Sequence, residues 1–216
     1  MSETVRNKRV GALEKLENSE AEDLAEKAIR DPSLLLEIFD GISSSNPKLK
    51  FKSAKILTFI SKKDPQTLYP KIDFFINFLD SENNILKWNA IDIIANLVSV
   101  DVDKRFDKIF GKFYGLLQEG SLITAAHVVD NSGKIAVAKP NLESKITNEL
   151  LKVEKIQLPT EECRNILAGK TILSFYQYYE QAQNKGEIIS FVKRQLSSSR
   201  RATRAKAERF LKKYSN

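Results

Sequence analysis

The sequence predicts an all-α protein that is built from about five consecutive helical hairpins. Three observations support this fold class: one helical motif recurs along the chain, apolar residues follow the period of the α-helix, and turn-forming residues are scarce. The 216 residues include only 8 glycines and 6 prolines, so few tight turns are available for a many-stranded sheet. The composition, with 42% hydrophobic and 29% charged residues, is that of an ordinary globular domain.

The recurring motif is an apolar stretch with a small residue at a fixed place. It occurs at residues 49–57, returns after 37 residues at 86–94, and returns after a further 35 residues at 121–129. In each copy, the small residue is followed by apolar positions one, three and four residues later, which lie on one face of a helix. The small residues, which we expect to admit a close neighbouring helix, are Ser53, Ala90 and Ala125.

Each of these second helices is preceded by a first helix, and their joints carry helix-start signals. Asp31-Pro32, Asn46-Pro47 and Asp64-Pro65 each place a capping residue before a proline. First helices are predicted at 32–43, 66–80, 102–118, 141–153 and 185–196, and the last second helix begins near Thr203. A single domain spanning 1–216 would then consist of N-terminal capping helices at 1–30, with Leu13 and Leu16 in the cap, and repeats at 31–63, 64–99, 100–138, 139–181 and 182–216.

Apolar residues cover more than one side of the second helices. In 85–98 they occupy well over half of the helix circumference. An isolated hairpin could not bury this surface, whereas stacked repeats can, because each repeat contacts a neighbour before and behind it. The sequence therefore predicts that the hairpins stack.

The stretch from Leu68 to Leu97 resembles the HEAT-repeat family of armadillo-like helical proteins. It has a proline in the first helix (Pro70), an aspartate at the turn (Asp80), and an apolar-basic-x-x-Ala opening of the second helix at 86–90. The resemblance implies a right-handed α-α superhelix, or solenoid, with the second helices on its concave side. The unit at 121–139 departs from the pattern, because it lacks the basic residue and carries a glycine inside a helix. The family consists mostly of protein-binding scaffolds, with some nucleic-acid binders.

A polar stripe is predicted along one face of the second helices. In 85–98 it consists of Asn89, Asp92 and Asn96, whose spacing places them on a single helical face. We expect this stripe to bind a partner in the concave groove, although it would also fit a simply solvated face. The equivalent residues of the other repeats are Lys52, Lys55 and Phe59 in the first, Thr124, His127 and Asn131 in the third, Lys170 in the fourth, and Lys206, Arg209 and Lys213 in the fifth.

The sequence contains no recognisable catalytic or metal-binding constellation. His127 is the only histidine and Cys163 the only cysteine, so a multi-histidine or multi-thiolate metal site is excluded. Gly169-Lys170-Thr171 lacks the upstream glycine of a phosphate-binding loop and is interpreted as part of a helix. We therefore expect no enzymatic activity, no metal and no small-molecule cofactor. The lone cysteine, the lack of a membrane-length apolar run and the lack of a secretory signal favour a cytoplasmic location.

The leading functional hypothesis is a non-catalytic scaffold that binds a protein or peptide along its concave face. The alternative is sequence-independent nucleic-acid binding through the basic C-terminal repeat. The chain carries a net charge of +7, and from Lys185 to the end it has ten basic and two acidic residues. Aromatic residues are not interleaved with these basic residues along the sequence, so stacking on nucleobases is not indicated.

A remote alternative comes from one subfamily of HEAT-like proteins, the DNA glycosylases that excise alkylated bases. Those enzymes use a Trp-x-x-x-Asp on a concave helix and an arginine in the next one. Trp88 and Asp92 match the first spacing, but the position equivalent to the arginine is His127. Without a cationic partner and further aromatic walls, an alkylated base would be poorly enclosed. The simpler interpretation is that Trp88 packs between repeats.

Overall fold

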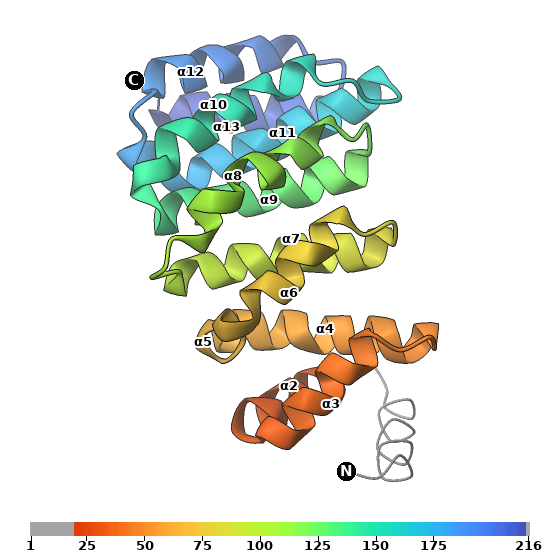
Figure 1. Ribbon diagram of the computed structural model, residues 1–216. Coiled ribbons are helices and arrows are strands. Elements are labelled where there is room, and N and C mark those ends of the chain that lie inside the picture. The colour runs from red at the N-terminus through yellow and green to blue at the C-terminus, as the bar shows by residue number, and fades with distance from the viewer. Residues whose placement is uncertain (1–19, 215–216) are drawn as a thin grey trace. The chain divides into compact units, whose positions relative to one another are not determined.

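The computed structural model describes residues 20–214, and its regular elements within that range are all helices (Figure 1). No strand occurs among these residues. The all-α prediction is therefore confirmed. The chain divides into two compact units, Met1–Val100 and Asp101–Asn216. The boundary falls at the predicted joint between the second and third repeats, and each unit is described by itself below.

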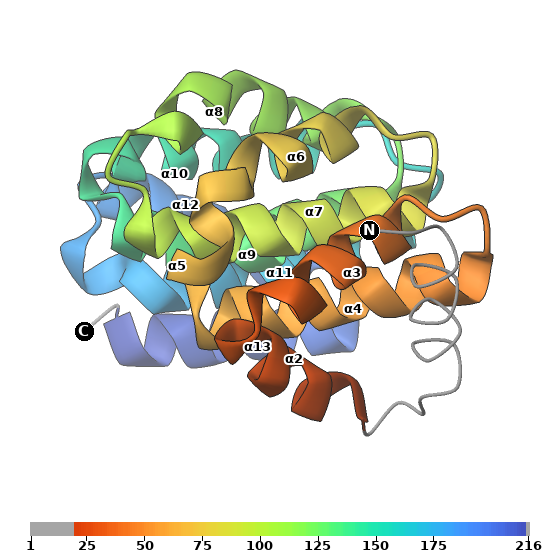
Figure 2. The same cartoon turned by 60° about the horizontal axis from the view of Figure 1, so that its bottom comes forward.

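In the N-terminal unit, α4 is the central helix and packs against α2, α3 and α7. The short helices α5 and α6 pack against α7, and Figure 2 shows α6 running along it. Of the predicted N-terminal cap, residues 20–30 form α2, whereas Leu13 and Leu16 lie outside the described residues. The helices of this unit are α2 (Glu20–Arg30), α3 (Pro32–Ile42), α4 (Pro47–Lys63), α5 (Pro65–Leu68), α6 (Ile72–Asn77) and α7 (Asn84–Leu97).

In the C-terminal unit, α11 lies between α9 and α13, and the three second helices form one row (Figure 1). The first helix α10 packs against α9 and α12, and α12 packs against α13. The helices of this unit are α8 (Arg105–Gly115), α9 (Leu122–Ala138), α10 (Glu143–Leu151), α11 (Glu161–Tyr178), α12 (Lys185–Arg194) and α13 (Arg201–Tyr214). Residues 169–171 lie inside α11, as predicted.

Side-chain caps fix several of the predicted helix starts. The Asp31 carboxylate accepts hydrogen bonds from the backbone N–H groups of Ser33 and Leu34 at the start of α3. The Asn46 side chain accepts one from Lys48 N at 3.0 Å and starts α4. These side chains satisfy backbone donors that the first turn of a helix leaves without partners. The joints at Asp31-Pro32 and Asn46-Pro47 are thereby confirmed.

The first helices are more broken than the sequence predicted. The expected helix at 66–80 consists of α5, a 3-10 turn at Tyr69–Lys71, α6 and a further 3-10 turn at Phe78–Asp80. Pro70 explains the first break, because proline has no N–H to donate and its ring crowds the preceding turn. The helix expected from residue 102 begins only at Arg105, after Lys104 in a left-handed conformation with φ of 52°.

Polar side chains join neighbouring hairpins at the sequence spacing of the repeat. Hydrogen bonds of this kind occur within both units, between residues that are 31 to 41 positions apart. This separation is close to the repeat length inferred from the recurring motif. Four examples are Thr58 with Asn89, Ser61 with Asn96, Asp130 with Lys170, and Asn165 with Ser199.

The small residues of the motif lie where helices approach each other. Ser53, Ala90 and Ala125 are all buried. A Cβ atom on Gly41 of α3 would collide with the Ser53 hydroxyl of α4. Gly133, the helical glycine that departs from the HEAT pattern, also lies close to a neighbouring helix. A Cβ atom at this position would lie 2.5 Å from the Gln177 side chain of α11.

We expect substitution of two helical glycines by alanine to change the stability of the protein in opposite directions. A Cβ on Gly169 would lie 2.7 Å from the buried Thr203 hydroxyl, so Gly169→Ala should destabilise the protein by about 1–3 kcal/mol through overpacking. Gly111 in α8 has no atom within 4 Å of that position. Gly111→Ala should instead stabilise by about 0.5–1 kcal/mol, because alanine loses less backbone entropy. Urea midpoints of the two variants measure both effects, and shifts of the same sign would contradict this packing.

Candidate partner-binding surfaces

The face of α4 that we predicted to bind a partner is open to solvent in part. Lys52, Lys55 and Phe59 are half-buried, and Lys62 continues the same face as an exposed residue. The Lys55 ammonium lies 6.0 Å from the centre of the Phe59 ring, at the outer limit of a cation–π contact. The orientation of α4 is set by its opposite side, where four fully buried side chains anchor the helix: Leu49, Ile56, Leu57 and Ile60.

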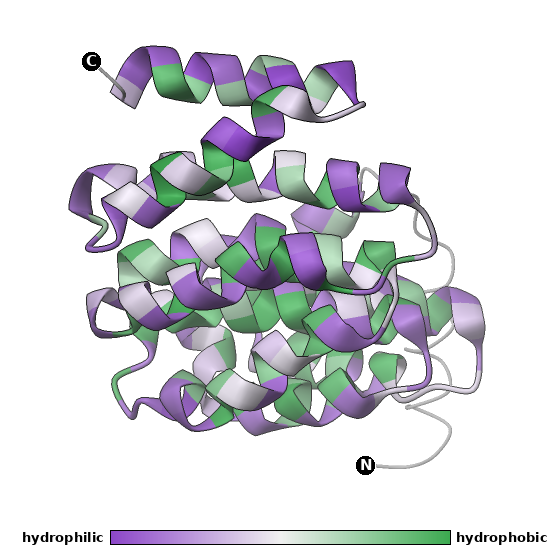
Figure 3. Cartoon of the chain, turned by 90° about the horizontal axis from the view of Figure 1, so that it is seen from above, coloured by the Kyte–Doolittle hydropathy of each residue, from purple (hydrophilic) through white to green (hydrophobic). Residues whose placement is uncertain are grey.

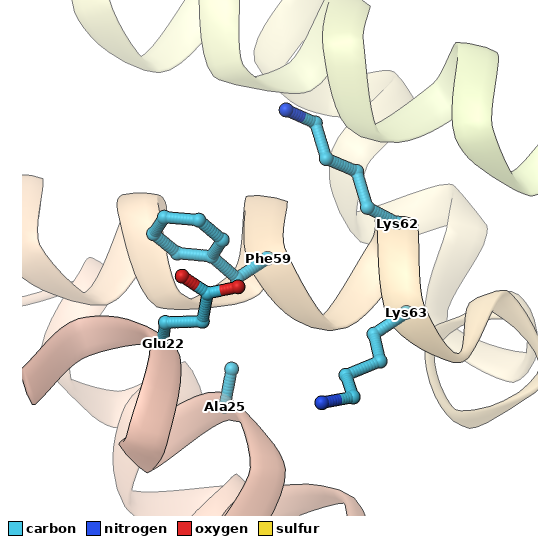
Figure 4. A pocket seen from close by; sticks show the side chains of 5 residues that line it. All are labelled: Glu22, Ala25, Phe59, Lys62 and Lys63. Carbon is cyan, nitrogen blue, oxygen red and sulfur yellow. The ribbon is translucent and has the colours of Figure 1, made fainter.

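A hollow of about 400 Å³ opens between α2 and α4 beside Phe59 (Figure 4). Lys63 forms an ion pair with Glu26 of α2, and the hydrogen bond and charge of Lys63 lower the pKa of that carboxyl. Lys62 has no carboxylate partner within residues 20–214. The Glu22 carboxylate lies beside the Phe59 ring in Figure 4, so the hollow combines an aromatic wall with charges of both signs. The hollow is lined by Glu22, Ala25, Phe59, Lys62 and Lys63.

On α7, two of the three predicted site residues also hold helices together. Asn89 Oδ1 accepts a 2.8 Å hydrogen bond from the Thr58 hydroxyl of α4. The Asn96 amide donates to the Ser61 hydroxyl at 2.9 Å. Both side chains therefore contribute to the α4–α7 contact, whatever else they bind. Asp92 is half-buried on the same helix.

The glycosylase-like spacing is preserved only within α7. Trp88 and Asp92 lie one turn apart on that helix, and both are half-buried. His127, the position equivalent to the glycosylase arginine, belongs to the C-terminal unit. The pair therefore stands as a spacing on one helix.

The predicted stripe on α9 is wrong at two of its three positions. Thr124 is fully buried and Asn131 is 5% exposed, and the Asn131 amide donates to the backbone carbonyl of His127. The open face instead includes Ile123 and Val137, which are 51% and 47% exposed. The physical reason is that α9 packs against α10, α11 and the end of its own hairpin, which buries a wide arc of the helix. His127 is half-buried at the edge of the open face.

On α11, the predicted site residue Lys170 is half-buried, and its ammonium lies 2.5 Å from the Asp130 carboxylate of α9. Three residues further on, Leu173 is 44% exposed. The sequence did not single out Leu173, Ile123 or Val137. Helical periodicity could not have identified them, because an apolar residue at helical spacing is usually part of the core.

On α13, the predicted stripe does reach the surface. Arg209 and Lys213 are exposed and Lys206 is half-buried. The Lys206 ammonium lies 3.5 Å from the point where a Cβ on Gly169 would stand, so it reaches over the α11 backbone. Burial lowers the pKa of Lys206, and the neighbouring positive charges of Lys170 and Arg200 lower it further.

The cations of α13 differ from those just before it. Arg194 contacts Glu154 at 2.7 Å, and Arg200 pairs with Glu162. In Figure 3, the colouring marks many residues of α13, the helix that ends beside the label C, as hydrophilic. Within the part of the chain that the structure describes, five cations of this helix form no ion pair with a carboxylate: Arg201, Lys206, Arg209, Lys212 and Lys213.

Arg204 of α13 donates hydrogen bonds to the backbone carbonyls of Ser198 and Ser199, at 2.6 and 3.0 Å, in the turn before its own helix. Arg204 therefore stabilises the start of α13 and is not one of the cations available to a partner.

Aromatic rings do lie beside these cations, contrary to what the linear sequence indicated. Tyr176 comes from α11, and the Lys213 ammonium lies 5.9 Å from its ring centre and 4.7 Å from that of Tyr214. The rings also pack on one another, with centres 4.3 Å apart for Tyr179 and Tyr214 and 4.8 Å apart for Tyr176 and Phe210. Much of their area is therefore committed to holding the last turns of α13 against α11.

Among residues 20–214, no three His, Cys, Asp or Glu side chains gather as a metal site would require. None of the described helices is long and apolar enough to cross a membrane. The Cys163 thiol accepts a hydrogen bond from the Thr160 hydroxyl at the start of α11, and Thr160 caps the same helix. Cys163 therefore occupies an ordinary position in the first turn of a helix.

Comparison with known proteins supports the helical fold and does not indicate a function. No protein-family model matches the sequence, and no curated protein matches it. Among solved structures, the chain is similar to the crystal structure of an engineered protein, a Northeast Structural Genomics Consortium target, with a TM-score of 0.57 and 16% sequence identity. The match covers 98% of this chain and 96% of that chain. At this identity the likeness concerns the fold alone.

Proposed function

We propose that this protein is a non-catalytic helical-repeat scaffold that binds a protein or peptide through the open face of its second helices. The observation that carries the proposal is the mixed surface of α9, α11 and α13. Exposed apolar side chains, such as Leu173 and Val137, lie there among charged residues that have solvent access. Such a combination suits a partner that buries apolar area and satisfies charges at the rim.

The repeat spacing supports a further part of the proposal, a right-handed superhelix that includes all the hairpins. The recurring motif continues from Ala90 to Ala125 across the boundary of the two units at an interval of 35 residues, close to the 37 that separate Ser53 from Ala90 within one unit. In a superhelix, α7 and α9 would pack at the 8–10 Å typical of neighbouring helices. Spin labels on these helices that report a much larger separation would rule out a continuous stack.

Site-specific photo-crosslinking in the native cell tests the binding function. A photoreactive amino acid at Phe59 or Leu173 would lie on the proposed binding faces. Matched controls at Leu36 and Lys145 would lie on exposed parts of the first helices α3 and α10. We expect discrete protein adducts from the first pair that resist nuclease and are absent from the second. Adducts that disappear with nuclease, or that form equally at the controls, would contradict the proposal.

A second candidate function, sequence-independent binding of nucleic acid, is favoured by the unpaired cations of α13. Exposed lysine and arginine side chains bind phosphates and release condensed counterions, which makes such binding steeply dependent on salt. The packing of the aromatic rings against one another speaks against base stacking, the usual second component of single-strand binding. We therefore place it after the protein-binding function.

A further inference from the structure

The pair of helices α11 and α13 presents a surface with a defined order of side chains. Two contacts fix their register: Lys206 reaches over Gly169, and Lys213 lies beside Tyr176. On each helix the two contacting residues are seven positions apart, which corresponds to about 10 Å along the helix axis. Along α11, Leu173 falls between the contacts, as Arg209 does along α13.

Leu173 is the apolar centre of this surface. Its side chain is 44% exposed, although α11 is otherwise firmly packed between α9 and α13. An isolated exposed leucine is common on protein surfaces and has no meaning alone. Here it lies between the levels of Lys206 and Lys213, about one helical turn before Tyr176, so an apolar side chain of a partner could be covered by ring and methylene groups.

The charges around Leu173 are strongly biased toward one sign. Lys206, Arg209 and Lys213 form no ion pair with a carboxylate within residues 20–214. Lys206 also lies close enough to Lys170 and Arg200 for their charges to disfavour its protonated form. Among the described residues, two carboxylates act on these cations. Asp130 faces Lys206 but is already paired with Lys170. A hydrogen bond to Tyr214 and the charge of Glu180 raise the pKa of Lys213, without an ion pair between Glu180 and Lys213. An added carboxylate would therefore relieve repulsion among these cations.

The surface favours a peptide over a nucleic acid as the source of those anions. A phosphate backbone would use the cations but leave Leu173 uncovered, since sugar and phosphate offer little apolar area there. Base stacking would need free ring faces, whereas Tyr176, Phe210 and Tyr214 pack on one another. A peptide that carries both carboxylates and an apolar side chain fits all of these observations.

We infer that the face of α11 and α13 around Leu173 binds an acidic peptide segment, with an apolar side chain seated on Leu173 and carboxylates on Lys206, Arg209 and Lys213. The inference rests on the proposed scaffold function and specifies the partner chemistry of one of its surfaces. The proposed site consists of three cations on α13 and one apolar residue on the adjacent helix α11.

The test measures binding of the full chain to fluorescein-labelled probes by fluorescence anisotropy. The first probe is a short synthetic peptide in which leucines at helical spacing are separated by glutamates. Its matched probes replace all leucines with serine, replace all glutamates with lysine, or are a single-stranded oligonucleotide of similar length. We expect the Glu/Leu peptide to bind most tightly at about 100 mM salt, and its affinity to fall as salt rises.

Two variants separate the charged and apolar contributions. Replacing Lys206, Arg209 and Lys213 together with glutamine should weaken peptide binding about tenfold or more, since one exposed ion pair is worth about 1.5- to 5-fold. Leu173→Ser should weaken binding about fivefold, because it removes partly buried apolar area. The matched control replaces three exposed lysines of the first helices with glutamine, and we expect a change of less than about twofold. Its positions are Lys108, Lys145 and Lys193.

Each outcome decides the inference. Equal loss in the triple variant and its control would overturn it, because the effect would then be one of net charge. Tighter binding of the oligonucleotide than of the Glu/Leu peptide would overturn it in favour of nucleic acid. If photo-crosslinking at Phe59 or Leu173 captures a protein partner while the acidic peptide does not bind, the scaffold function stands and this inference fails.

Discussion

Replacing Lys139 with methionine is expected to destabilise the C-terminal unit by about 3–5 kcal/mol, the usual effect of removing one partner from a buried ion pair. The Lys139 ammonium lies 2.8 Å from the Asp101 carboxylate and 3.2 Å from that of Asp107, and it donates to the Asp101 carbonyl. The lysine side chain is 9% exposed and that of Asp101 is fully buried. Asp101 also accepts the backbone N–H groups of Arg105 and Phe106, so this cluster fixes the start of α8.

The urea midpoint of the variant measures this loss. Lys145→Met makes the same chemical change on an exposed face of α10 and should shift the midpoint only slightly. Asp101→Asn combined with Lys139→Met should cost less than the sum of the single changes, because the pair acts as a unit. Equal shifts for Lys139→Met and Lys145→Met would show that the cluster contributes nothing.

The same cluster predicts how stability depends on pH. Burial lowers the pKa of Lys139, but hydrogen bonds and charges from Asp101 and Asp107 outweigh it, so the pKa is raised above its usual 10.5. A raised pKa in the folded state means that the stabilisation is complete below pH 10.5 and is lost as pH rises through the folded value. The wild-type protein should therefore lose stability above about pH 10.5 more steeply than Lys139→Met.

The sequence was sufficient for the fold class and for most helix positions because these depend on local chemistry. The caps at Asp31 and Asn46 act on the next turn of the chain, and the buried faces follow the helical period. The small residue Ser53 correctly marked a close approach of α3 to α4, and Ala90 is buried. The exact first and last residues of the helices depended on backbone features that the sequence does not reveal, such as the left-handed conformation of Lys104 before α8.

The candidate surface was harder to predict, because solvent access depends on neighbours that one helix does not reveal. The stripe held on α4 and α13, where Phe59, Arg209 and Lys213 have solvent access. It failed at Thr124 and Asn131, because α9 packs against other helices over a wider arc than one register shift could indicate. Whether the accessible residues bind a partner stays a prediction.

Buried charges were the features that sequence reasoning missed entirely. A lysine or glutamate in a helical pattern is normally assigned to the solvated face, since burial of a charge is costly without a partner. Lys139 and Glu143 are nevertheless buried, because each has a hydrogen-bond partner that is about 40 positions away in the sequence. The repeat spacing could have suggested such pairs, because it places residues one repeat apart side by side.

Glu143→Ala is the second substitution from which we expect a large effect, a loss of about 3 kcal/mol or more, since hydrogen bonds to a charged group contribute about 1.5–3 kcal/mol each. The Glu143 carboxylate is buried at the start of α10. One oxygen accepts from the Thr147 hydroxyl at 2.7 Å, and the other accepts from the backbone N–H of Gln183 at 3.0 Å. Thr147 is in turn hydrogen-bonded to the buried Tyr178 hydroxyl of α11.

Removing the carboxylate would leave the Gln183 N–H without its acceptor in the turn that leads into α12, so α10, α11 and α12 should all lose support. Glu143→Gln keeps one carbonyl oxygen as an acceptor, but its amide NH₂ group would face either the Thr147 hydroxyl or the Gln183 N–H, which are both donors. We therefore expect an intermediate loss of stability. Glu208→Ala on the exposed side of α13 is the matched control and should change stability by less than about 0.5 kcal/mol. Thermal and urea unfolding of the three variants provide the comparison. If Glu143→Ala were as mild as Glu208→Ala, the buried network would not hold these helices together, and packing of rings such as Phe175 on Phe191 would have to do so alone.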